Sequence, residues 1–412
     1  MEQRRKNLTQ LFIPICLETL LYMLSGMVDT LMLSSVNDQA VGAVGTANTY
    51  IGIFIIMFSV ISSGMVAVMT QNIGAGRPGV AYQARQLGLA FNAVLGIILS
   101  LILAFGAGTI LAGVGVADAL MQPARTYLQI VGGFCILNAL IPICSSYLRA
   151  FGFSKEPLYA SIIGNVINFC LNAFFLFVLH KGVAGVATAT VVSRIINLVI
   201  VVLLGAVLVK AKKHPERESN REVMGQIIRI GLPSACETAI YNVSMTLVIR
   251  FLNQMDAQGL NVTARSYTMQ ITNFSYCVGA ALAQANAIMT GWRIGAKEYD
   301  ACDRGTRKAA IIGVIVAVIL ETMFALCSGW IMQLFSKDPQ MVSLVGKLLA
   351  IDIVLEMGRV TNLVYGQALK TSGDAVFPVV MGACFMILCS VGGTYLFGIR
   401  LGLLAVGAYI GM

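Results

Sequence analysis

The sequence predicts an all-α polytopic membrane protein built from two six-helix lobes in a pseudo-two-fold repeat. Three observations predict this fold class. The 412 residues are 58% hydrophobic and only 11% charged, whereas a soluble domain carries about 25% charged residues. The apolar residues form long continuous runs, and several short segments recur later in the chain. Lipid is therefore the main solvent of the chain, and its net charge of +9 is not a nucleic-acid signal.

Eleven apolar runs are long enough to be membrane-spanning helices, since a span needs about 20 apolar residues. They cover residues 9–35, 40–69, 87–113, 123–149, 157–180, 184–209, 226–253, 262–290, 309–333, 340–369 and 376–398. A twelfth run starts near Leu401 and reaches Met412, whereas its counterpart at the sixth helix is much longer. We therefore expect the twelfth helix to be incomplete.

The repeat is visible in loops and in helix starts. Residues 148–157 return as residues 369–378, with a leucine, a basic residue, a glycine and a proline at the same places. Four residues of the first helix return in the seventh: Pro14, Glu18, Thr19 and Tyr22 become Pro233, Glu237, Thr238 and Tyr241. The repeat predicts lobes at 1–209 and 226–412, joined by a solvated polar linker at 210–225. Many transporters place their substrate path at the seam between such repeats.

The distribution of Lys and Arg predicts the orientation of the chain. The N-terminus and every second loop hold 19 of the 28 basic residues. Short loops rich in Lys and Arg stay on the cytoplasmic side. We therefore expect a multi-pass protein of a bacterial inner (plasma) membrane, with the N-terminus, the linker and both repeated loops in the cytoplasm.

Several segments, in this order and spacing, carry a resemblance to a known family. They are AVGAVG (40–45), NIGAG (72–76), LRAFG (148–152) and GVAGVATAT (182–190). Together with the two repeats and the basic linker, they resemble the multidrug and toxic compound extrusion (MATE) transporters, more the DinF-like branch than the NorM-like branch. The resemblance implies a V-shaped antiporter that uses a Na⁺ or H⁺ gradient to export organic, often cationic, compounds.

Two carboxylates interrupt the first apolar run. Glu18 and Asp29 are eleven residues apart, which places them within about 20° on one helix face and about 16 Å apart along the axis. An ionisable group inside a membrane marks a functional site by default. Two carboxylates on one face suit a path for a proton or a cation. Alternatively, Glu18 snorkels or pairs locally near a helix end.

Three asparagines share one stripe of the fifth helix, at Asn165, Asn168 and Asn172. The resemblance implies that Asp29, Asn168 and Thr190 match the ion site of the DinF-like branch, whereas Asn172 stands where that branch has an Asp. Amide and hydroxyl oxygens can still surround Na⁺ beside one carboxylate, and a lone buried Asp can instead take up a proton. The asparagines could also serve interhelical hydrogen bonds alone.

The second lobe has its own charged cluster, made of Glu237, Asp352, Glu356 and Arg359. The spacing of Glu356 and Arg359 predicts a buried contact between them, either as a structural ion pair or as part of a gate. Arg359 occupies the position of the tenth-helix Asp in the NorM-like branch, so we do not carry that branch's cation site over to this chain.

The eighth helix carries polar residues on one face, Gln270, Asn273 and Gln284. This stripe predicts either the lining of a central cavity or hydrogen bonds between helices.

These observations predict a secondary antiporter that exports organic, cationic, drug-like compounds in exchange for Na⁺ or H⁺. We expect a monomer in a lipid bilayer, with no cofactor besides the coupling ion and no nucleic-acid partner. The chain shows no histidine cluster, CxxC pair or phosphate-binding loop, which argues against an enzyme. A flippase for a lipid-linked or polyanionic substrate is the alternative. Such a protein would need a basic cavity, whereas the charged residues predicted inside the membrane are mostly acidic. A receptor or channel also remains open.

Overall fold

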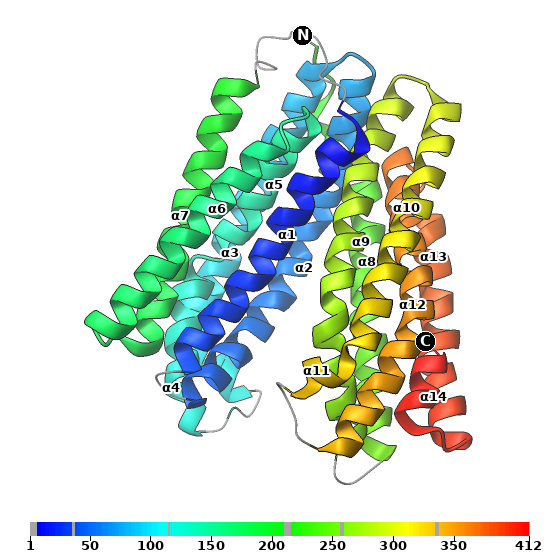
Figure 1. Cartoon of the computed structure of the whole chain (residues 1–412). Helices are drawn as coiled ribbons and strands as arrows, with labels where there is room; N and C mark the ends of the chain where they lie inside the picture. Colours follow the sequence, from blue (N-terminus) through cyan, green and yellow to red (C-terminus); the bar gives the residue numbers. More distant parts are fainter. Residues whose placement is uncertain are drawn as a thin grey trace. The chain divides into compact units, whose positions relative to one another are not determined.

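The computed structural model describes residues 6–34, 38–113, 116, 118–209, 216–255, 259–333 and 338–411, and these residues are mostly helical (Figure 1). The chain divides into two compact units, unit 1 from Met1 to Leu232 and unit 2 from Pro233 to Met412.

Unit 1 contains the first seven α-helices and the beginning of an eighth. They are α1 (Leu8–Ser34), α2 (Asp38–Gly74), α3 (Pro78–Gly113), α4 (Asp118–Tyr127), α5 (Ile136–Ala150), α6 (Lys155–Ala173), α7 (Gly182–Leu208) and the start of α8 (Asn220–Met255). Two short π-helical segments, η1 (Leu128–Gly132) and η2 (Phe174–Val178), extend α4 and α6. The core between α2, α3, η1 and α7 includes the fully buried Leu103, Leu111 and Leu128.

Unit 2 contains the rest of α8 and six more α-helices. They are α9 (Leu260–Gly295), α10 (Tyr299–Leu326), α11 (Ser328–Gln333), α12 (Pro339–Ser372), α13 (Val376–Phe385) with its π-helical extension η4 (Met386–Arg400), and α14 (Leu404–Gly411). The helix α12 packs against both α9 and α10. The buried core of this unit includes Leu252, Met332 and Leu348.

The predicted spans are helical, but they are not equally apolar. Within the described residues, seven helices are long and apolar enough to cross a membrane, and a broken helix, 120–132 plus 136–150, is bent by 42° and would make an eighth. The helices α8, α9 and α12 have 36, 36 and 34 residues, so they are long enough to span. They fall short in apolarity because they carry polar and charged residues such as Arg265, Asp352 and Glu356. The count of eleven spans stays a prediction.

The repeated loops fold in the same way in both units. Gly152 and Gly373 have φ angles of +86° and +108°, which L-residues with side chains rarely adopt. In each loop the residue after the glycine donates its backbone N–H to the repeated leucine: Phe153 to Leu148 O (2.9 Å) and Asp374 to Leu369 O (3.1 Å). These bonds satisfy a carbonyl at the end of each helix, so the repeated leucine and glycine reflect one helix-ending motif used twice.

The end of the predicted linker is held by unit 1. Arg77 forms an ion pair with Glu218. The Gln83 amide donates to Glu218 O (2.7 Å) and accepts from Glu218 N–H (3.1 Å). These contacts fix the last part of the linker predicted at 210–225 against unit 1, and residues 210–215 of that linker lie outside the described part of the chain.

Unit 1 extends past the predicted linker to Leu232, and the first turns of α8 pack closely against α2. A Cβ atom added at Gly231 would lie 1.8 Å from Val60 O, and one added at Gly64 would lie 2.0 Å from Ile227 O. The two helix backbones therefore approach each other closely through glycines.

We expect Gly231→Ala to lower the stability of the protein, because the added methyl group overlaps the Val60 carbonyl oxygen and forces a backbone shift. Overpacking of this kind costs about 1–3 kcal/mol. Gly225→Ala is the matched control on α8, since no atom lies within 4 Å of its added Cβ. The measurement is the melting temperature of each purified variant, and an equal melting temperature for the two variants would contradict the close approach.

Candidate ion site in unit 1

Asp29 meets the asparagine stripe where α1 packs against α6. The Asn172 amide donates from Nδ2 to Asp29 Oδ1 (2.6 Å) and to Asn168 Oδ1 (3.2 Å). Asn172 is fully buried and Asn168 is 5% exposed, whereas Asp29 is half-buried. The Asp29 carboxylate thus accepts a hydrogen bond from a buried amide and is itself partly exposed. A group that binds and releases an ion or a proton needs both features.

Further polar side chains of the predicted ion site lie on α6 and α7. Among the described residues, Asn172 Oδ1 is buried without a hydrogen-bond partner, and so is Asn165 Nδ2. Thr190 is 6% exposed and donates its hydroxyl to Val186 O (2.9 Å), so its oxygen lone pairs stay available. Buried oxygens without donors beside a carboxylate are suitable ligands for a hard cation.

Arg194 on α7 is a residue that the sequence reasoning missed. Its positive charge interacts electrostatically with Asp29. The sequence could have indicated it, because Arg194 is an isolated cation inside the apolar run at 184–209. A charged residue inside a membrane helix marks a functional site by default.

Glu18 does not join the Asp29 site. Its carboxylate accepts a hydrogen bond from Arg149 Nη2 (2.5 Å), with 17% of the Glu18 side chain exposed. Its repeat counterpart Glu237 forms an ion pair with Lys370, the counterpart of Arg149. Each pair ties the first helix of its repeat to the repeated loop, so Glu18 has an ion-pair partner on another helix, and its share in a path with Asp29 stays a prediction.

The charged cluster of unit 2 differs in membership from the predicted one. Arg359 donates to Glu356 Oε2 (2.6 Å), which is the contact that the spacing predicts, and lies 3.8 Å from Asp352 Oδ1. Glu237 pairs with Lys370 instead. Glu321 on α10 takes its place, and it is fully buried. Glu321 was missed although it is a lone carboxylate in the apolar run at 309–333.

The polar stripe of α9 faces mostly outward within unit 2. Gln270 and Asn273 are exposed, and Gln284 is half-buried. Their role in lining a substrate cavity stays a prediction.

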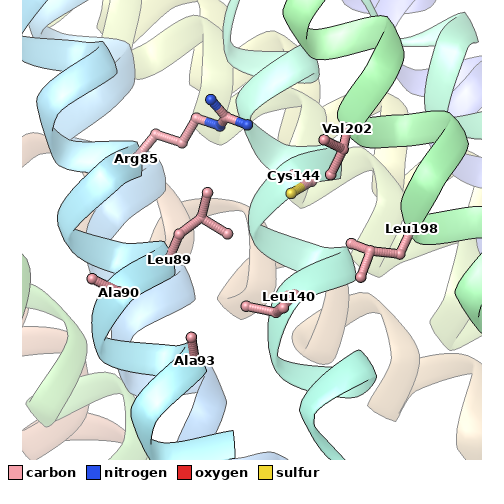
Figure 2. A pocket seen from close by; sticks show the side chains of 8 residues that line it. All are labelled: Arg85, Leu89, Ala90, Ala93, Leu140, Cys144, Leu198 and Val202. Carbon is pink, nitrogen blue, oxygen red and sulfur yellow. The ribbon is translucent and has the colours of Figure 1, made fainter.

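A separate pocket of about 380 Å³ opens between α3, α5 and α7 (Figure 2). Its lining is apolar apart from Arg85 and Cys144; the residues are Arg85, Leu89, Ala90, Ala93, Leu140, Cys144, Leu198 and Val202. The Arg85 guanidinium lies 4.6 Å from the centre of the Tyr147 ring. Asp29, Asn168, Asn172 and Thr190 do not line this pocket, so it is distinct from the candidate ion site.

The MatE family model matches the chain twice, at residues 14–174 and 233–396. This chain belongs to the MATE family. Both matches begin at the repeated prolines, Pro14 and Pro233, so each half of the chain carries one copy of the family's repeat.

Relatives of this MATE protein extend over almost its whole length. It is 33% identical to the uncharacterized transporter YisQ of Bacillus subtilis over 403 residues, 96% of this chain and 88% of YisQ. It is 23% identical to the probable multidrug resistance protein NorM of Thermotoga maritima, over 99% of this chain and 89% of that protein.

Solved structures give the same fold. An outward-facing MATE transporter of the MOP superfamily superposes with a TM-score of 0.87 at 18% identity, covering 98% of this chain and 90% of that one. A MATE structure in a straight conformation gives 0.88 at 19% identity, covering 98% and 91%. The protein is therefore an all-α, multi-pass membrane transporter of an efflux family and not an enzyme.

Proposed function

We propose that this MATE protein is a secondary antiporter that exports organic cations in exchange for Na⁺ or H⁺, and that Asp29 carries the coupling ion. The observation behind this proposal is the contact between Asp29 and the buried Asn172 amide, made between two membrane helices of unit 1. We further propose that the protein acts as a monomer in a bacterial inner membrane with its N-terminus in the cytoplasm.

Coupling requires that the ion and the substrate favour opposite conformations of the same element. An empty Asp29 is an anion that keeps its hydrogen bond from Asn172. A bound proton or Na⁺ neutralises that anion, and this changes which packing of α1 against α6 is favoured. In the sodium case, Asn172 Oδ1, which has no hydrogen-bond partner, and the Thr190 hydroxyl are candidates to complete an oxygen shell around the ion.

A flippase for a polyanionic substrate is the alternative function. A phosphate-rich substrate would need a basic cavity. In unit 2, the three buried carboxylates of Glu321, Asp352 and Glu356 lie close together with a single arginine, Arg359, paired to them. This balance favours export of cations over transport of polyanions.

We expect proteoliposomes containing the protein to move a fluorescent organic cation only when an ion gradient is imposed. The measurement applies a Na⁺ gradient at equal pH and, separately, a pH gradient without Na⁺, with the membrane potential clamped. Transport under one gradient identifies the coupling ion. Equal dye movement with and without either gradient would contradict antiport, and so would transport of lipid-linked anions in place of the dye.

A further inference from the structure

The pocket between α3, α5 and α7 has a charged side chain at one end and apolar side chains along the rest of its length (Figure 2). On α3, Arg85, Leu89 and Ala93 follow one another at four-residue intervals, so they lie along one face of that helix. The other two walls repeat this spacing, with Leu140 and Cys144 on α5 and with Leu198 and Val202 on α7. The pocket is therefore an elongated groove along three helices, with Arg85 at one end.

Arg85 is a cation without an anionic partner in the described part of the chain. Its guanidinium lies 4.6 Å from the centre of the Tyr147 ring and beside the Cys144 thiol. Its Nε is buried and has no hydrogen-bond partner, and no described carboxylate forms an ion pair with it. Arg149 and Arg359, by contrast, each pair with a carboxylate. Charged groups inside a membrane protein are normally paired, so Arg85 calls for an anion from outside the chain.

The depth of Arg85 along α3 matches the level of lipid phosphates. The helix has 36 residues and is about 54 Å long, whereas the hydrocarbon core of a bilayer is about 30 Å thick. Arg85 lies two residues before the apolar run of 87–113 begins, which places it at the boundary between hydrocarbon and headgroups. Leu89 and Ala93 lie about 6 and 12 Å further along the helix axis, in the hydrocarbon.

The groove opens toward the lipid-facing side of unit 1. Ala90 and Val202 on its rim are exposed. The neighbouring Val94, Val199 and Leu203 are 60%, 49% and 59% exposed, as apolar side chains that face acyl chains should be. The single charge in the lining is positive, so it repels an organic cation and attracts an anion that carries hydrocarbon.

We propose that the groove binds one anionic phospholipid, with its phosphate on Arg85 and one acyl chain along Leu89, Leu140 and Ala93. The planar guanidinium of arginine suits two phosphate oxygens at once, and basic pockets between membrane helices bind lipid headgroups. An anionic headgroup is favoured over a zwitterionic one, because the amine of a zwitterionic lipid competes with Arg85 for the phosphate. This site is additional to the antiport proposed above and does not depend on it.

The test titrates phosphatidylglycerol into the purified full-length protein in detergent and counts bound lipid by native mass spectrometry. We expect one tightly held lipid per chain, and Arg85→Met should weaken its binding at least fivefold while keeping the apolar stem. Arg307→Met is the matched control, because Arg307 is an exposed arginine two residues before the apolar run of α10 at 309–333. It should change binding less than twofold. Equal lipid affinity of Arg85→Met and the native protein would overturn the proposal.

A second variant tests the acyl-chain end of the groove without changing any charge. Ala93→Phe places a ring in the groove and should also weaken lipid binding at least fivefold, which provides a test if Arg85→Met does not fold. Glycerol phosphate, the headgroup without acyl chains, should not compete with the lipid at equal concentration. Native lipid affinity in Ala93→Phe, or competition by glycerol phosphate, would contradict an acyl chain in the groove.

Photolabelling locates the bound lipid in the native protein. Phosphatidylglycerol with a photoreactive group in one acyl chain should label peptides of α3, α5 and α7 that line the groove, and an excess of unlabelled phosphatidylglycerol should suppress this labelling. Labelling confined to other helices would overturn the proposal. Displacement of the lipid by a fluorescent organic cation would overturn it as well, since the groove would then bind the transported substrate.

Discussion

Asp29→Asn should abolish gradient-driven efflux while leaving the amount of protein in the membrane near normal. Asparagine has nearly the same shape as aspartate, so the contact with Asn172 (2.6 Å in the native chain) can be kept in altered form. It cannot bind a proton reversibly or neutralise a cation. Without a charge that changes, the ion no longer favours one conformation over the other, and only passive binding of substrate remains.

The measurement is dye efflux from cells that express each variant, with the membrane level of the protein determined in parallel. Glu18→Gln is the matched control on α1, because the Glu18 carboxylate is paired with Arg149. We expect it to reduce efflux far less than Asp29→Asn does. Gradient-dependent efflux at the native rate by Asp29→Asn would place the coupling elsewhere, with the carboxylates of unit 2 as the next candidates.

Arg149→Ala should give the largest loss of stability among single substitutions at the repeated ion pairs. It leaves the Glu18 carboxylate, 17% exposed, without its cationic partner. Removing one partner of a buried pair costs about 3–5 kcal/mol, and we expect a value below this range because both side chains keep some exposure. Lys370→Ala should cost less, since its partner Glu237 is 26% exposed.

The melting temperatures of the purified variants measure this effect, and a double-mutant cycle isolates the pair. Glu18→Gln combined with Arg149→Gln should recover much of the stability lost in Arg149→Ala, because no charge is then left alone. A double variant that melts as low as Arg149→Ala would mean that Arg149 acts through packing and not through its charge. A greater loss for Lys370→Ala than for Arg149→Ala would contradict the ranking by exposure.

Much of the fold was predictable from the sequence. Membrane helices need long apolar runs, and the repeat at residues 148–157 and 369–378 marks equivalent helix ends, each with a glycine of positive φ. The start of α8 was not predictable. Its first turns pack against α2 through Gly64 and Gly231, and a close approach of two backbones leaves no pattern in hydrophobicity.

The candidate site in unit 1 was predictable only in part. Helix periodicity places Asn168 and Asn172 on one stripe, and the cost of burying a charge singles out Asp29. The sequence alone could not tell that Glu18 faces Arg149, 131 positions away, instead of Asp29 on its own helix. Spacing along one helix determines which residues share a face, whereas the neighbouring helix determines which partner that face meets.

The sequence by itself determined the class of the protein, its two-fold repeat and the residues whose burial is costly enough to require a function. Only the tertiary structure decided how those residues group. It separates Glu237 from the cluster around Arg359 and brings in Glu321 from α10. The physical reason is that periodicity is a property of one helix, while charge compensation depends on contacts between helices far apart in the chain.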